Sequence, residues 1–218
     1  MSQKDIFKKS EGDAWFIRNQ DGLKNKNMGL DPIVTEFKNL ISAKLIDSSL
    51  NKKIRILEVG CGDGSRGKYI SELLDCEYYG VDPSQRAVVA AVQNGLIASV
   101  GTAEALPYDD NFFDVIIYGF CLYLCDREDL TAISCEANRV LRADSWLMVL
   151  DFFAEKETEN AYHHHKSVKS FKMDYRKVFE VTHSYTCYFH KIMDHETFEY
   201  TYNKDNWIAV SLMRKNAL

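Results

Sequence analysis

The sequence has little of several features that mark common protein classes. Three prolines and 11 glycines in 218 residues exclude a collagen-like, proline-rich or largely disordered chain. Basic residues are not in excess, because 27 Lys and Arg stand against 32 Asp and Glu and the net charge is −5. A protein that grips a phosphate backbone over a wide face is usually basic. We therefore expect no nucleic acid as a partner.

Long apolar runs are also missing. The most apolar stretch, residues 115–125, is too short to span a bilayer and directly follows Asp114. The first 13 residues carry mixed charges and no apolar segment, so no secretory signal is predicted. The six cysteines include no C-x-x-C pair. We expect reduced, buried thiols, no metal site and a cytoplasmic protein.

Short apolar runs alternate with helical patterns through the middle of the chain. Such alternation predicts βαβ units and a parallel sheet that is covered on both faces. Two further runs near the C-terminus have no clear helix between them, which predicts an antiparallel pair at one edge of the sheet. The predicted strands are residues 53–59, 77–81, 97–100, 113–120, 146–152, 184–193 and 207–213, and the predicted helices are residues 65–74, 84–93 and 126–141.

A glycine-rich loop follows the first predicted strand and opens the next helix. Residues 57–64 contain the pattern E-x-G-x-G-x-G, and Asp82 ends the following strand. A parallel sheet binds nucleotide-like ligands at this place, and a carboxylate there can accept both ribose hydroxyls. A dinucleotide site requires G-x-G-x-x-G, but Ser65 takes the last position. Glu58 disfavours a pyrophosphate and suits a cationic amino-acid moiety. A nicotinamide-dependent oxidoreductase is the alternative enzyme.

Four segments, residues 57–64, 80–84, 101–107 and 110–120, resemble in order the motifs of the class I S-adenosylmethionine-dependent methyltransferases. The resemblance covers about residues 50–152 and implies S-adenosylmethionine as cofactor and S-adenosylhomocysteine as product. In the family the glycine loop packs the methionine part and the ribose, and an acid like Glu104 accepts from the adenine amino group. The implied cofactor residues are Trp15, Arg18, Asn19, Glu58, Gly60, Cys61, Gly62, Asp82, Pro83, Ala103, Glu104, Gly119 and Phe120.

The expected fold is α/β, with a Rossmann-like, seven-stranded, mostly parallel sheet and an antiparallel edge strand, as in the class I methyltransferases. We expect a single domain. Residues 21–28 read as a loop, and residues 154–181 are polar, charge-rich and irregular. The expected parts are a helical N-terminal lid (1–50), a cofactor-binding core (51–152), a substrate-side insertion (153–183) and closing strands (184–218).

A basic island follows the fifth predicted strand. Residues 162–177 hold eight His, Lys and Arg against one acid, Asp174. This island predicts an anionic acceptor, and the alternative is a solvated charged loop. Histidine suits a general base because its pKa lies near working pH, so His164 is the first candidate, followed by Asp174 or Tyr175. The candidate acceptor contacts are Tyr123, Tyr162, Lys172 and Arg176.

A narrower group shows similar stretches at residues 11–19, 119–126 and 162–175, with Phe171 where tyrosine is usual. Its members are commonly encoded among bacterial surface-polysaccharide genes. The resemblance implies methyl transfer to oxygen or nitrogen of a small anionic sugar, uronate or uronamide in capsule or related biosynthesis. The alternative to an enzyme is a regulatory subunit that binds the cofactor and does not catalyse a reaction. The residues leave the oligomeric state open.

Overall fold

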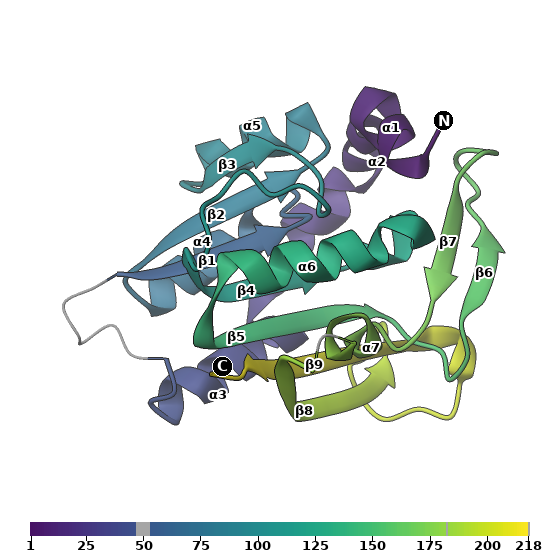
Figure 1. Ribbon diagram of the computed structural model, residues 1–218. Coiled ribbons are helices and arrows are strands. Elements are labelled where there is room, and N and C mark those ends of the chain that lie inside the picture. Colours follow the sequence, from purple (N-terminus) through teal and green to yellow (C-terminus); the bar gives the residue numbers. More distant parts are fainter. Residues whose placement is uncertain (47–52, 182, 218) are drawn as a thin grey trace.

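The computed structural model of the protein describes residues 1–46, 53–181 and 183–217 (Figure 1). Its main sheet has seven strands in the order β3-β2-β1-β4-β5-β9-β8. The strands from β3 to β5 are parallel, and β9 runs antiparallel between β5 and β8. The predicted seven-stranded sheet is therefore confirmed. The strands are β1 (Ile54–Val59), β2 (Cys76–Asp82), β3 (Ile97–Val100), β4 (Phe113–Gly119), β5 (Leu141–Phe152), β8 (Tyr185–Asp194) and β9 (Trp207–Lys215).

Helices cover both faces of the sheet, with α6 in front and α3 and α4 behind in Figure 1. Alternate residues of each buried strand pack on opposite faces of the sheet, since side chains along a strand point to opposite sides. Ile56 packs in the same cluster as Phe37 of α3, whereas Leu57 packs with Ile133 of α6. The α-helices are α1 (Gln3–Ile6), α2 (Gly12–Asn25), α3 (Pro32–Ser42), α4 (Ser65–Leu73), α5 (Gln85–Gln93), α6 (Leu130–Val140) and α7 (Arg176–Glu180).

The N-terminal segment lies at the carboxyl ends of the parallel strands (Figure 1). A short π-helical turn, Phe7–Glu11, joins α1 to α2. Asp31 caps the N-terminus of helix α3, because its carboxylate accepts hydrogen bonds from the amides of Ile33 and Val34, and Pro32 occupies the first helical position. This cap returns the chain to the sheet at a defined place. The boundary expected at residues 50 and 51 lies outside the described residues.

Two loop predictions were wrong. Residues 154–181 contain a two-stranded hairpin, β6 (Thr158–Ala161) and β7 (Lys169–Lys172), followed by α7. All four residues of β6 are exposed, so no apolar alternation marks the strand. Helix α2 likewise runs through residues 21–25, because a polar exposed helix has no apolar period to detect. Short 3-10 turns complete the chain at Met28–Leu30, Leu122–Leu124, Arg127–Asp129 and Lys204–Asn206.

The predicted helix at residues 126–141 begins with the 3-10 turn Arg127–Asp129, and its α-helical part starts only at Leu130. Strand β5 starts at Leu141, five residues before the prediction. Element ends are the least reliable part of a pattern-based prediction, since the terminal turn of a helix is often 3-10. Among the described helices, none has the length and apolarity needed to cross a membrane.

Candidate functional site

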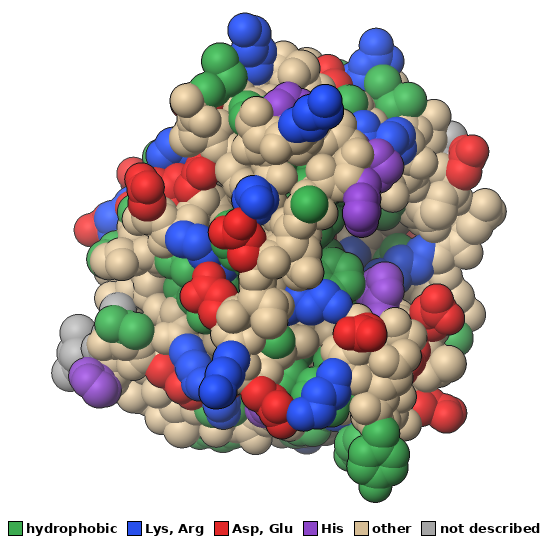
Figure 2. Space-filling model, turned by 90° about the vertical axis from the view of Figure 1, so that its right-hand side faces the viewer, with side chains coloured by type: hydrophobic (Ala, Val, Ile, Leu, Met, Phe, Trp, Pro, Cys, Tyr) green, Lys and Arg blue, Asp and Glu red, His purple; other side chains and the backbone are tan. Residues whose placement is uncertain are grey.

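A pocket of about 670 Å³ opens at the carboxyl ends of β1, β2, β4 and β5. This volume falls in the range of small-molecule sites. The N-terminal helices, the glycine loop and the β6–β7 hairpin all contribute to its walls. Figure 2 shows a hollow on this face, with hydrophobic and histidine side chains on its wall and Lys or Arg beside it.

The glycine loop forms one wall. Gly60 has φ +74°, and a Cβ there would lie 2.7 Å from the Cβ of Cys121. Only glycine tolerates both the left-handed backbone and this close approach. The amide of Gly62 donates to the Asp82 carboxylate over 3.0 Å, and the amide of Ser84 donates over 2.9 Å. Burial raises the pKa of Asp82 to about 6, so the group is ionised at pH 7.

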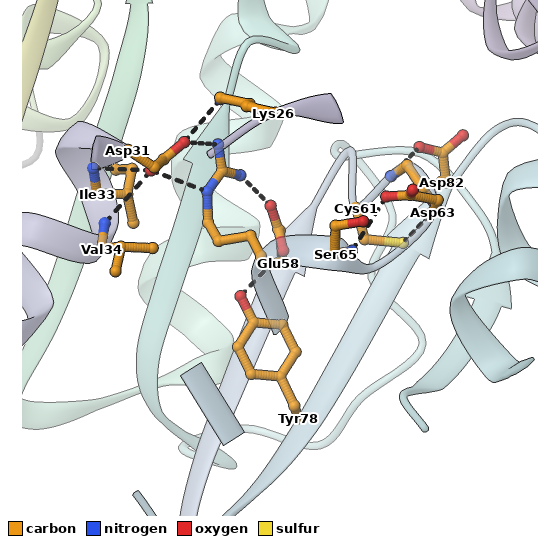
Figure 3. A network of polar contacts seen from close by, with 12 residues as sticks. Lys26, Asp31, Ile33, Val34, Glu58, Cys61, Asp63, Ser65, Tyr78 and Asp82 are labelled. Carbon is orange, nitrogen blue, oxygen red and sulfur yellow. Dashed lines mark hydrogen bonds and ion pairs between the residues drawn. The ribbon is translucent and has the colours of Figure 1, made fainter. Parts of the chain in front are cut away.

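Glu58 takes part in a buried ion network below this loop (Figure 3). Its carboxylate pairs with the Arg66 guanidinium and accepts a 2.9 Å hydrogen bond from Tyr78 Oη. Arg66 also reaches Asp31, with Nη2 3.1 Å from Oδ2, and Lys26 Nζ lies 2.7 Å from the same oxygen. Arg66 therefore provides the opposite charge for the buried Glu58 carboxylate.

Two cations determine the ionisation of Asp31. Burial alone would raise the pKa of this carboxyl, but Arg66 and Lys26 outweigh burial and hold the pKa well below its ordinary value. Asp31 and Glu58 are 0% and 1% exposed. The network therefore couples the start of α3 to the first strand and the glycine loop, and it is worth most as a complete unit.

Ala103 and Glu104 also line the pocket. The carboxylate of Glu104 accepts a 2.8 Å hydrogen bond from Thr102 Oγ1 and lies 3.7 Å from Lys4 Nζ. The position of Glu104 suits the expected contact with an amino group of a base, and Lys4 had not been predicted there.

The N-terminal helices and the β6–β7 hairpin close over the pocket together. Glu11 is 5% exposed, and its Oε1 accepts hydrogen bonds from Tyr162 Oη at 3.0 Å and from Arg18 Nη2 at 2.5 Å. Gln3 adds a second link, because its side-chain oxygen accepts from the amide of Lys169. Segments about 150 residues apart in sequence thus form one cover.

Aromatic side chains line the remaining wall. Phe120 lies 5.4 Å from Phe152 between ring centroids, and Tyr123 lies 5.0 Å from Phe152. Lys26 Nζ is 5.9 Å from the centre of the Phe120 ring. His195 contacts both Phe120 and Phe152. This part of the pocket can hold a ring-shaped acceptor against flat apolar surfaces.

The pocket gathers most of the predicted residues. Every predicted cofactor residue except Arg18 lines it, and so do Tyr123, Tyr162 and the candidate base His164. Arg18 contacts Glu11 and Tyr162 instead. Sequence reasoning missed Lys26, Phe152 and His195, which also line the pocket. No local motif surrounds these residues, so only the folded chain identifies them.

Four predicted acceptor-side residues lie elsewhere. Asp174, Tyr175, Arg176 and Lys172 do not line the pocket formed by the described residues. The Asp174 carboxylate is engaged by Arg176, whose Nη2 lies 3.0 Å away. Tyr175 is 3% exposed, and its hydroxyl donates to the carbonyl of Phe171 over 3.1 Å. Neither of the two alternative candidates for the base, Asp174 and Tyr175, therefore faces the pocket.

Phe171, where the narrower group has tyrosine, is 8% exposed beneath the Arg127 guanidinium, which lies 4.1 Å above its ring. The position packs against a cation and does not face the pocket.

Across residues 1–46, 53–181 and 183–217, no group of three or more His, Cys, Asp or Glu has the arrangement of a metal site.

The pocket fits an adenosyl ligand with an amino-acid tail. Asp82 is a carboxylate acceptor at the end of β2, and the backbone beside it is open at Gly62, where a Cβ would lie 3.9 Å from Leu23 Cδ1. A Cβ at Gly12 would lie 2.8 Å from the Phe7 carbonyl oxygen and 3.2 Å from the Ser84 nitrogen, so glycine lets α2 close onto the β2–α5 turn. Asp13 secures this contact by accepting a 2.6 Å hydrogen bond from Ser84 Oγ.

Residues 57–149 match the family model described as a methyltransferase domain. The uncharacterised methyltransferase YcgJ of Bacillus subtilis is 31% identical over 111 residues, which are 47% of this chain and 42% of that protein. Rv2003c of Mycobacterium tuberculosis, also uncharacterised, is 32% identical over 96 residues, which are 44% of this chain and 31% of that protein. The chain thus matches less than half the length of these curated relatives.

Solved structures share the fold at low sequence identity. A S-adenosylmethionine-dependent methyltransferase of Methanosarcina mazei has a TM-score of 0.63 and 15% identity, over 82% of this chain and 98% of that chain. A methyltransferase solved in complex with the activator Trm112 of Haloferax volcanii has a TM-score of 0.65 and 16% identity. The match covers 100% of this chain and 99% of that chain. Residues 57–149 thus match a methyltransferase domain, and the chain shares its fold with solved S-adenosylmethionine-dependent methyltransferases.

Proposed function

We propose that this protein transfers the methyl group of S-adenosylmethionine to an oxygen or nitrogen of a small anionic acceptor, a sugar, uronate or uronamide derivative of bacterial capsule or other surface-polysaccharide biosynthesis. One observation carries the proposal. A single pocket joins the Asp82 carboxylate and the glycine loop to an aromatic wall around Phe120 and Phe152. Donor and acceptor therefore have adjoining places.

The residues of this chain act mainly by positioning. Bound S-adenosylmethionine supplies an electrophilic methyl group on a positively charged sulfur. Asp82 orients the ribose, Glu104 the adenine, and the network of Glu58 and Arg66 holds the loop beside the methionine part. Most of the rate would come from presenting the acceptor in line with the methyl group. The hydrogen bond from Tyr162 to Glu11 joins the hairpin to the N-terminal helices over the pocket.

The charge of the acceptor is inferred from Lys172 and its surroundings. Its Nζ lies 5.7 Å from the centre of the Phe152 ring and donates to the carbonyl of Asp205. Within the described ranges no carboxylate lies within 4.0 Å of this ammonium, whereas Lys169 pairs with Glu159 and Arg176 with Asp174. Lys172, which lies beside the aromatic wall of the pocket, thus has no carboxylate partner in the described part of the chain and can attract an anion.

We assign the parts of the chain accordingly. Within residues 1–50, helices α1 and α2 form the lid, whereas α3 packs against the sheet. Residues 51–152 are the cofactor core, residues 153–183 the acceptor-side insertion and residues 184–218 the closing strands. The proposed acceptor contacts are Tyr123 and Tyr162 in the pocket, with Lys172 beside it. His164, which also lines the pocket, is the base that the sequence predicted.

The test is a screen of uronates, uronamides and nucleotide sugars with S-adenosylmethionine, read by mass spectrometry as the gain of one methyl group. A methylated charged sugar would support the proposal. Methylation only of neutral lipids or cationic amines would contradict the acceptor class. Binding of S-adenosylhomocysteine without turnover would favour the regulatory subunit, and the Trm112 complex of the Haloferax neighbour makes an activator the next addition to the assay.

A further inference from the structure

His195 stands in the wall of the pocket, directly after strand β8. Its imidazole centre lies 5.4 Å from the Phe120 ring and 5.2 Å from the Phe152 ring. The backbone amide of His195 donates to the carbonyl of Asn206 over 2.9 Å. The imidazole is therefore held in place by two aromatic rings and a fixed turn.

Phe120, whose ring contacts His195, has a strained backbone conformation. It has φ +57°, a left-handed conformation that is strained for a phenylalanine. The amide of Phe120 donates to the carbonyl of Leu150 over 2.8 Å, which keeps this conformation in place. Strained residues persist where the surrounding structure over-determines them, and they cluster at functional sites. Here the strained residue places its ring against His195 in a T-shaped contact.

The nitrogen atoms of His195 are available to a ligand. Among the described residues, none forms a hydrogen bond with the His195 imidazole, whereas His190 in β8 shares a 2.8 Å hydrogen bond with Ser211 Oγ. His195 as a whole is exposed, because it stands at the mouth of the pocket, and the two rings cover one flank. A group bound in the pocket can therefore reach the ring nitrogens.

The charges around His195 favour the neutral imidazole. Partial burial lowers its pKa, and the nearby Lys26 and Lys172 lower it further. Asp194 and Glu196 act in the opposite direction, but the net shift is downward. A base needs the neutral form, which this surrounding keeps populated at neutral pH.

We propose that His195 is the general base that takes the proton of the acceptor during methyl transfer, in place of His164; the inference rests on the proposed function. As the acceptor atom bonds to the methyl carbon, the bond from sulfur to that carbon breaks and leaves a neutral thioether. The acceptor proton goes to a ring nitrogen of His195 and from there to water. His164 is exposed on the hairpin, where its ring contacts Tyr162.

The experiment compares His195→Gln with His164→Gln and with His163→Gln, an exposed hairpin control that does not line the pocket. The acceptor panel of uronates, uronamides and nucleotide sugars is incubated with methyl-labelled S-adenosylmethionine between about pH 5.5 and 8.5. We expect His195→Gln to lower turnover by about a hundredfold or more and to remove the decline at low pH. Its affinity for S-adenosylhomocysteine should stay within about twofold of the wild type, and His163→Gln should retain turnover.

Three results would overturn the assignment. His195→Gln could retain wild-type turnover and pH dependence, His164→Gln could lose more, or His195→Gln could lose cofactor affinity. Absence of transfer by the wild type would instead overturn the proposed function and, with it, this role of His195. A histidine proton titration by NMR gives an independent readout, since a pKa of His195 at or above the ordinary value of about 6.5 would also contradict the proposal.

Discussion

The amide of Gly62 and the carboxylate of Asp82 are joined by a hydrogen bond of 3.0 Å. One oxygen of the acid thus holds the glycine loop, while the other accepts from the amide of Ser84 at the start of α5. The residue proposed to hold the ribose also organises the two turns that flank it. Its removal therefore affects both the ligand contact and the shape of the loop.

Asp82→Ala should weaken binding of S-adenosylhomocysteine by about tenfold to a hundredfold, as expected when hydrogen bonds to a charged group are lost. Titration calorimetry measures this change. Asp75→Ala is the matched control, because the Asp75 side chain is 71% exposed and pairs with Lys53 at the surface. NAD at the same concentrations should not bind. Unchanged affinity for S-adenosylhomocysteine in Asp82→Ala would contradict the ribose assignment.

The same affinity should depend on pH. Because burial raises the pKa of Asp82 to about 6, a growing fraction of the free protein carries a protonated acid as the pH falls below 6. A protonated carboxyl is a poorer acceptor for ribose hydroxyls, so affinity should fall by up to about tenfold per pH unit there and level off above pH 7. Asp82→Asn should flatten this profile. A flat wild-type profile from pH 5 to 7 would refute the prediction.

Arg66→Met should strongly destabilise the fold. The substitution removes the positive charge that pairs with both Glu58 and Asp31, and it leaves these two carboxylates buried. Breaking a buried pair in this way costs about 3–5 kcal/mol. Tyr78→Phe, which removes one hydrogen bond to Glu58, should cost about 1–2 kcal/mol and remain folded.

The free energy of unfolding in urea tests both values. Lys53→Ala breaks an exposed pair and serves as the control, with an expected change below about 1 kcal/mol. If Arg66→Met and Tyr78→Phe both behaved like Lys53→Ala, the network would have no structural role.

Tyr162→Phe should loosen the cover of the pocket. It removes the hydroxyl that donates to Glu11 over 3.0 Å and accepts from Arg18. We expect faster amide hydrogen exchange in β6 and β7, with unchanged exchange in the central strands. Tyr202→Phe is the control, because this side chain is fully exposed. Equal exchange in wild type and Tyr162→Phe would show that the hairpin is held by other contacts.

The acceptor charge predicts a salt effect. An anionic acceptor attracted by Lys172 should show a higher KM at higher ionic strength, since salt screens exposed charges over about 10 Å at 0.1 M. Lys172→Ala should raise KM and reduce its dependence on salt, and cofactor affinity should change much less. A KM that does not respond to salt, or faster turnover of a neutral analogue, would exclude the anionic acceptor and leave the cofactor assignment intact.

The sequence by itself determined the sheet and predicted the cofactor side of the pocket. Strand runs, the glycine loop and an acid such as Asp82 at a strand end are local patterns, and the parallel topology brings strand ends to one edge. The exposed hairpin at residues 158–172 has no such pattern, so its strands escaped prediction.

Only the tertiary structure decided which side chains meet across the pocket. Glu11 and Tyr162 are 151 residues apart, and Arg66 and Asp31 are 35 apart. His195 reaches the pocket from the turn after β8, while Tyr175, which lies within the basic island in sequence, packs in the core with residues of α6. Side-chain periodicity reports which face of one element is buried. It carries no information on how distant loops close over a sheet, because those contacts form only when the whole chain packs.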